Sequence, residues 1–74
     1  MSELKRIHTD QAPAAIGPYS QAIVSDGWAF CSGQIPLDPA SGELKLGSVA
    51  DQTDLCLSNL GQVLQAAGSS LAHV

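Results

Sequence analysis

A single segment of this chain, residues 49–67, repeats apolar residues at helical spacing, and it constrains what the rest can form. Ser48 stands where an N-cap residue belongs, with Asp51 in the first turn, and Gly68 stands where a left-handed cap ends a helix. The expected apolar face consists of Val49, Thr53, Cys56, Leu60, Val63, Leu64 and Ala67, with Leu57 widening it. We therefore predict one helix over residues 49–67, laid across a sheet.

The residues before the helix predict that sheet. Residues 21–24 and 28–32 are rich in β-forming side chains, and Asp26-Gly27 between them is a strong signal for a tight hairpin turn. We therefore expect an antiparallel hairpin over residues 21–32. A short edge strand is also expected over residues 4–9.

The second strand of the hairpin carries apolar side chains on both faces. Trp28 and Phe30 point one way, whereas Ala29 and Cys31 point the other. This pattern indicates a sheet interior or an interface between molecules, because a free surface strand would alternate apolar and polar residues.

The last residues of the sequence predict the start of a further β-strand. After the break at Gly68, a new strand is expected to start at Val74. Gly61, inside the helix, is expected to let the helix lie close on the sheet. One hairpin, one edge strand and one helix make a thin core, because so short a chain buries little of its surface. We therefore expect residues 1–74 to be the amino-terminal portion of a single α+β domain, truncated after its first helix.

Composition argues against several classes of function. The formal net charge is −4, and the three basic residues, Lys5, Arg6 and Lys45, form no stripe that would bind nucleic acid. No apolar run approaches the roughly 20 residues of a membrane span. Two separated cysteines and two separated histidines offer no metal cluster, so no cofactor or metal is expected. Together with the unpaired cysteines, these features favour a cytoplasmic protein with neither nucleic-acid nor membrane partners.

Two segments present polar groups where a ligand can approach. Gly17-Pro18 forces a turn that presents Tyr19, the only tyrosine, at the entrance to a strand. Ser32 and Gly33 place a hydroxyl and a glycine amide at the end of a strand, where backbone can come close to a ligand. The alternatives stay open at this point: Tyr19 can be a hydrogen-bonded packing residue, and Ser32-Gly33 can be a bulge.

The other reactive side chains do not assemble into a catalytic set. Ser32 lacks the sequence context of an activated nucleophile. Cys31 and Cys56 are interpreted as small buried hydrophobes. His8 is expected in the edge strand, in a surface or sheet-contact role. The carboxylates fall in turns, in the amino-terminal segment and at the helix start, so no pair suggests acid–base chemistry. No catalytic residue is therefore predicted within this chain.

Residues 12–22, with the sequence APAAIGPYSQA, and residues 32–39, SGQIPLDP, followed by Ser41-Gly42-Glu43, closely resemble the opening of the Rid family, also called YjgF. Gln52 and the run from Val63 to Gly68 resemble the first helix of that family. The resemblance implies a chorismate-mutase-like α+β fold and homotrimers with pockets between subunits. It also implies hydrolysis of 2-iminobutanoate and 2-iminopropanoate to 2-oxo acids and ammonia, without a cofactor.

By the same resemblance, Tyr19, Ser32 and Gly33 match pocket-lining positions that bind the substrate. The family arginine that holds the substrate carboxylate and the glutamate that handles the water have no counterpart in this chain. We therefore expect the chain alone to show no imine hydrolysis. Two other functions remain open: a regulatory module that binds a small carboxylate without turnover, and ribonuclease action, which the acidic charge disfavours.

Overall fold

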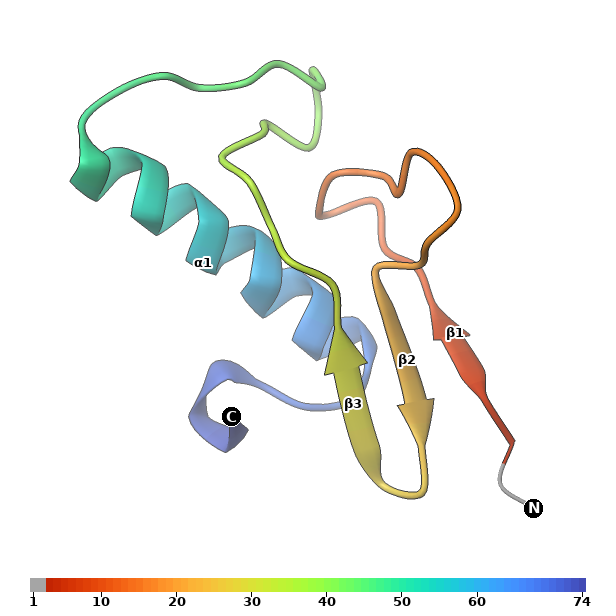
Figure 1. The fold of residues 1–74 in the computed structure, drawn as a ribbon. Helices are drawn as coiled ribbons and strands as arrows, with labels where there is room; N and C mark the ends of the chain where they lie inside the picture. Colours follow the sequence, from red (N-terminus) through yellow and green to blue (C-terminus); the bar gives the residue numbers. More distant parts are fainter. Residues whose placement is uncertain (1–2) are drawn as a thin grey trace.

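The computed structural model describes residues 3–74. Three short strands, β1 (Lys5–Ile7), β2 (Ala22–Ser25) and β3 (Trp28–Cys31), form an antiparallel sheet in the order β1-β2-β3. One helix, α1 (Val49–Ala66), crosses one face of this sheet, and a single 3-10 turn, η1 (Leu71–His73), follows it (Figure 1). The arrangement is α+β, with strands first and the helix after them.

A tight turn joins β2 to β3. Asp26 has a φ of 53° and Gly27 a φ of 80°, and Ser25 pairs directly with Trp28. Two successive residues with positive φ match the right-handed twist of the strands, which is why Asp-Gly suits this position. Compared with the expected bounds, β2 begins and ends one residue later, and β3 ends one residue earlier. Gln21 and Ser32 lie outside the strands, although the Ser32 amide still donates to the Gln21 carbonyl.

Side chains and backbone close both ends of α1. At the start, the Ser48 hydroxyl accepts a hydrogen bond from the Asp51 amide at 3.1 Å. At the end, Gly68 adopts a φ of 83°, its amide donates to the Gln65 carbonyl, and the Ser69 amide donates to the Leu64 carbonyl at 2.8 Å. This pair of reversed hydrogen bonds is a Schellman motif, which needs the left-handed conformation that glycine adopts without strain.

The core lies between the sheet and the second half of α1. It consists of Ile7, Ala12, Ala22 and Val63, with Val24, Cys31 and Ala67 packed against it. The first half of the helix is exposed: the Val49 side chain belongs to the expected apolar face, yet it is 82% exposed. The expected face is therefore used only where the sheet lies beneath it. The two cysteines are half-buried rather than buried.

The end of the chain folds back on the helix. Leu71–His73 form a 3-10 turn that ends at Val74, so the strand expected to begin at Val74 stays a prediction. The expectation for Gly61 is wrong. Gly61 does not face the sheet, because a Cβ built on it would lie 3.4 Å from Cδ1 of Leu71. The missing side chain of Gly61 instead makes room for the chain where it folds back on the helix.

A long loop over residues 33–47 connects β3 to α1. Within this loop, Leu37 and Leu44 form one isolated antiparallel β-bridge. The Asp38 carboxylate accepts hydrogen bonds from the amides of Ser41 and Ala40. These two amides hold the pKa of Asp38 below its ordinary value. Within residues 3–74, α1 is not apolar enough to cross a membrane, and neither is the short turn η1.

Candidate functional site

The structure brings the two polar segments together at one end of the β2–β3 hairpin. The Ser32 hydroxyl donates to the Ser20 carbonyl at 2.5 Å, and the Ser32 amide donates to the Gln21 carbonyl at 3.0 Å. Ser32 is thereby fixed beside the residue that follows Tyr19. Because its hydroxyl proton is engaged, the Ser32 oxygen remains available as an acceptor.

Gln21 organises this end of the sheet, and the sequence interpretation missed it. Its side chain is only 2% exposed. Its amide nitrogen donates to the carbonyls of Thr9 and Pro13, and its amide oxygen accepts from the Thr9 amide at 2.7 Å. The backbone amides and carbonyls of the loop before β2 need hydrogen-bond partners, and the Gln21 side chain offers both a donor and an acceptor. This need for partners is the only signal in the sequence that pointed to a structural role for Gln21.

Tyr19 lies at the mouth of this arrangement. Gly17, with a φ of 108°, makes a tight turn in which the Tyr19 amide donates to the Gly17 carbonyl at 2.9 Å. The ring is 53% exposed, and its hydroxyl has no hydrogen-bond partner within residues 3–74. A notch of about 270 Å³ beside it is lined partly by Arg6 and His8. The Tyr19 ring is therefore half exposed at the surface, and its role in binding a ligand stays a prediction.

Gly33 offers an unobstructed amide. In the part of the chain that the structure describes, its N–H donates to no other group. A Cβ built on Gly33 would meet nothing within 4 Å. A ligand can therefore approach this backbone closely, and the site has one donor, Gly33 N–H, beside one acceptor, Ser32 Oγ.

Asn59 holds the loop that follows Gly33, and this residue was also missed. It is almost fully buried in the middle of α1. Its side-chain nitrogen donates to the carbonyls of Leu37 at 2.9 Å and Ile35 at 3.3 Å. The only signal in the sequence for this pair of hydrogen bonds is that Asn59 is a polar residue on an otherwise apolar helix face.

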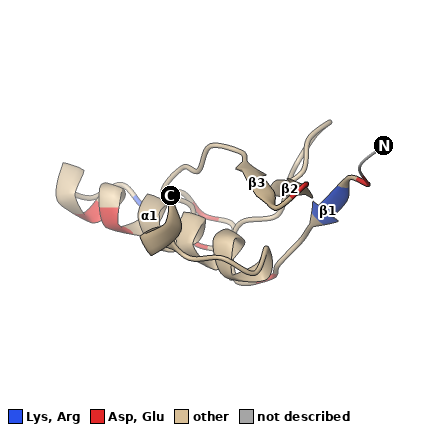
Figure 2. Cartoon of the chain, turned by 90° about the horizontal axis from the view of Figure 1, so that it is seen from below, with Lys and Arg blue, Asp and Glu red and all other residues tan. Residues whose placement is uncertain are grey.

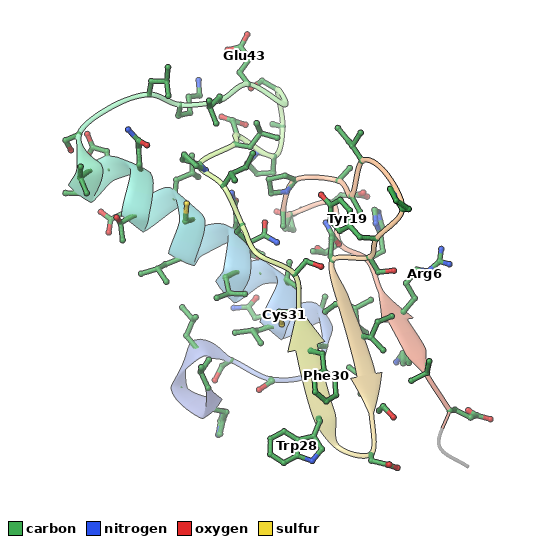
Figure 3. The ribbon with its side chains drawn as sticks, in the orientation of Figure 1. Arg6, Tyr19, Trp28, Phe30, Cys31 and Glu43 are labelled. Atoms are coloured by element: carbon green, nitrogen blue, oxygen red, sulfur yellow. The ribbon has the colours of Figure 1, made fainter. Side chains whose placement is uncertain are left out.

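Charged groups do not converge on the site. Figure 3 shows Arg6 on β1 and Glu43 in the long loop, well apart from each other. His8 instead has Asp10 as its partner, with Nε2 and Oδ1 3.0 Å apart. Among residues 3–74, no three His, Cys, Asp or Glu side chains are grouped to hold a metal ion. The groups on the Ser32-Gly33 side of the described site are therefore neutral, and Arg6 lines only the notch beside Tyr19.

Basic charge is confined to separate places. Figure 2 shows the lysine and arginine colouring on β1 and on a short piece near α1, with acidic colouring on the first half of the helix. This distribution gives no continuous basic surface, which is the usual footprint of nucleic-acid binding.

The sheet, the helix and the site together define a small α+β protein whose polar groups gather at one end of a hairpin. The family model described as Endoribonuclease L-PSP matches residues 9–74, and the chain belongs to this family, the Rid/YjgF family that the sequence resembles. Solved structures of the family share its fold. The Rid-family protein YyfA from Yersinia pestis is 43% identical and superposes with a TM-score of 0.89 over 93% of this chain and 55% of its own.

Other relatives carry more specific names. The 2-iminobutanoate/2-iminopropanoate deaminase of Bos taurus is 50% identical over 76 aligned positions, covering 100% of this chain and 56% of its own length. TdcF of E. coli, solved with bound serine, is 47% identical with a TM-score of 0.80, covering 90% of this chain and 52% of its own. The chain thus spans about half the length of the relatives it matches.

Proposed function

We propose that this chain forms the neutral side of the pocket of an imine deaminase. The complete enzyme would hydrolyse 2-iminobutanoate and 2-iminopropanoate to 2-oxo acids and ammonia. The observation that carries the proposal is the hydrogen bond from Ser32 to Ser20, which joins the segment that contains Ser32 and Gly33 to the segment that contains Tyr19. The deaminase name of relatives at about 50% identity supports the choice of reaction.

The chemistry suits these groups. Water adds its oxygen to the imine carbon, the C=N bond becomes single, and the resulting carbinolamine expels ammonia as the carbonyl forms. The substrate therefore needs a donor on its own oxygens and an acceptor for the attacking water. We assign the donor to Gly33 N–H and the acceptor to Ser32 Oγ, with Tyr19 bounding the pocket and offering its hydroxyl. No cofactor enters this scheme.

Two charged functions would come from outside the described residues. A cation must hold the substrate carboxylate, and an ionisable group must move protons to and from the water and the leaving nitrogen. We propose that a family arginine and glutamate supply them in a cytoplasmic homotrimer whose pockets lie between subunits. The exposed Trp28 and Phe30 on the outer face of the sheet support an assembly of this kind, because such aromatic surface is typical of interfaces.

A chimera tests the proposal. This chain would replace the matching half of the bovine deaminase, and a dehydratase would supply the imine while ammonia release is followed. We expect the chimera to accelerate hydrolysis and the 74-residue chain alone to give none. Gly33→Ala should lower kcat/KM by roughly tenfold or more without unfolding the chimera, because the added methyl group meets ligand but no protein atom. Ser58→Ala, on the exposed helix surface, is the matched control.

A second function has its own support. TdcF was solved with serine, an amino acid bearing a carboxylate, which favours a module that binds small carboxylates without turnover. Calorimetric titration of the chimera with serine separates the two functions. Serine binding with no ammonia release would replace the deaminase proposal, whereas RNA cleavage by the chimera would overturn both.

A further inference from the structure

The notch beside Tyr19 carries a positive charge, although the chain as a whole has a net charge of −4. Arg6 of β1 lines this notch of about 270 Å³, and Figure 3 shows Arg6 and Tyr19 at the same end of the sheet. Lys5, the preceding residue, does not line it. Successive side chains of a strand point to opposite faces, so the two neighbouring cations of β1 serve different surfaces.

Arg6 has no acidic partner in the part of the chain that the structure describes. The ion pairs among residues 3–74 are His8–Asp10 and Lys45–Glu43. No aspartate or glutamate of these residues lines the notch. A guanidinium group carries five N–H donors in a planar fork that matches the oxygens of a carboxylate or a phosphate. The notch therefore contains a cation whose donors the described residues leave unused.

Neutral donors line the same notch. The Tyr19 hydroxyl has no partner within residues 3–74, and in the same range the amides of Ala15, Gly17 and Ser20 donate to no other group. Gly17 has a φ of 108°, and backbone amides in turns of this kind form concave sites for anions. A phosphate group has three or more strong acceptor oxygens and up to two negative charges, so it can use more of these donors than a carboxylate can.

We propose that this notch binds a phosphoryl group, carried either by the free phosphate ion or by a small phosphate monoester. Arg6 would hold two of its oxygens, and the Tyr19 hydroxyl and the Gly17 amide would donate to the remaining ones. Ser32 and Gly33, to which the imine is assigned, do not line the notch. The phosphoryl site is thus a second site, and Ser20 connects the two, because it lines the notch while its carbonyl accepts from Ser32.

A titration followed by NMR tests the proposal. Inorganic phosphate would be added to the isotope-labelled chain at constant pH and constant ionic strength, so that general screening by salt does not change. We expect the amide signals of Gly17 and Ser20 to shift and to saturate with a Kd of about 1 mM, while the Gly68 amide at the end of α1 stays constant. If the signals do not saturate at about ten times that concentration, the proposal is wrong.

A second titration, with methyl phosphate, distinguishes the two sources of the group. Binding tighter than that of inorganic phosphate assigns the notch to a phosphorylated small molecule, and weaker binding assigns it to the free ion. Titration with 2-oxobutanoate tests the carboxylate alternative. If 2-oxobutanoate moves the same amides with a lower Kd than either phosphate, the notch belongs to the carboxylate side of the deaminase pocket, and the proposal of a phosphoryl site is overturned.

Two variants of neighbouring cations make the test specific. Arg6→Gln should weaken phosphate binding by roughly tenfold or more, because it removes the charge and the fork of donors from the notch. Lys5→Gln removes the same charge from the other face of β1, so it should weaken binding by less than about twofold. Equal weakening by both variants would mean attraction by overall charge and would contradict the proposal. Should the chain lack helical circular dichroism in solution, the same titrations of the chimera decide.

Discussion

The two faces of the sheet are built from alternate residues of the same strands, yet this chain covers only one of them. On the inner face, Ala22 and Ile7 are buried beneath Val63 of α1. On the outer face, Trp28 is 69% and Phe30 62% exposed. Both faces are apolar, so the difference comes from what lies over them rather than from the strands themselves. Among residues 3–74, nothing covers these two aromatic side chains, and exposed apolar surface of this kind is typical of interfaces.

The largest effect is expected on the inner face. Val63→Ala removes two methyl groups from a side chain with no exposed surface and should lower the free energy of unfolding by about 2 kcal/mol. Val49→Ala is the matched control, because it makes the same change in the same helix at a side chain that is largely exposed. It should change stability by less than about 0.5 kcal/mol. Urea titration followed by circular dichroism measures both, and equal losses would show that α1 does not pack as described.

A somewhat smaller loss of stability is expected where Asn59 of α1 is hydrogen-bonded to the loop over residues 33–47. Asn59→Ala leaves the carbonyls of Ile35 and Leu37 without their side-chain partner and should cost about 1.5 kcal/mol. Ser58→Ala, one position away on the exposed surface, serves as the control in the same urea titration. Faster amide exchange in the 35–37 segment should accompany the loss, and its absence would assign the effect of Asn59 to the helix alone.

The pattern of apolar residues was enough to predict the hairpin and the helix, but not the side-chain hydrogen bonds that hold the loops around them. The Asp26-Gly27 turn and the caps at Ser48 and Gly68 are local, so their residues determine them directly. Gln21 and Asn59 form hydrogen bonds with residues between 8 and 24 positions away in sequence, and periodicity carries no information about such contacts. The sequence therefore did not reveal what holds Tyr19 and Ser32 in one site.

The same limit explains the error at Gly61. Leu71 folds back toward Gly61, a contact that short-range patterns do not describe. Periodicity also placed Val49 on the buried face of the helix, although it is 82% exposed at the first turn of α1.

On the outer face, stability and association should separate. Phe30→Ser removes an exposed ring whose cross-strand partner is Ile23, so the free energy of unfolding should fall by less than about 1 kcal/mol. The chimeric enzyme carrying the same change should lose assembly in sedimentation velocity. A loss of stability as large as that of Val63→Ala would mean that the ring is covered in the chain itself, and the contrast between the faces would fail.

The smallest effect concerns Asp38, which belongs to neither face. The amides of Ser41 and Ala40 lower its pKa in the folded chain, so its ionised form contributes stability above the ordinary value of 3.8. That contribution is lost as the pH falls through the lowered pKa, because the protonated carboxyl accepts these bonds less well. Acid titration by NMR should move the Ala40 and Ser41 amides in that window while the Val63 signals stay constant. Asp38→Asn is the control, because its side chain keeps an acceptor oxygen but does not titrate, so the signals of the Ala40 and Ser41 amides should stay constant. If the Val63 signals of the unaltered chain shift together with those of the loop, the turn is coupled to the core.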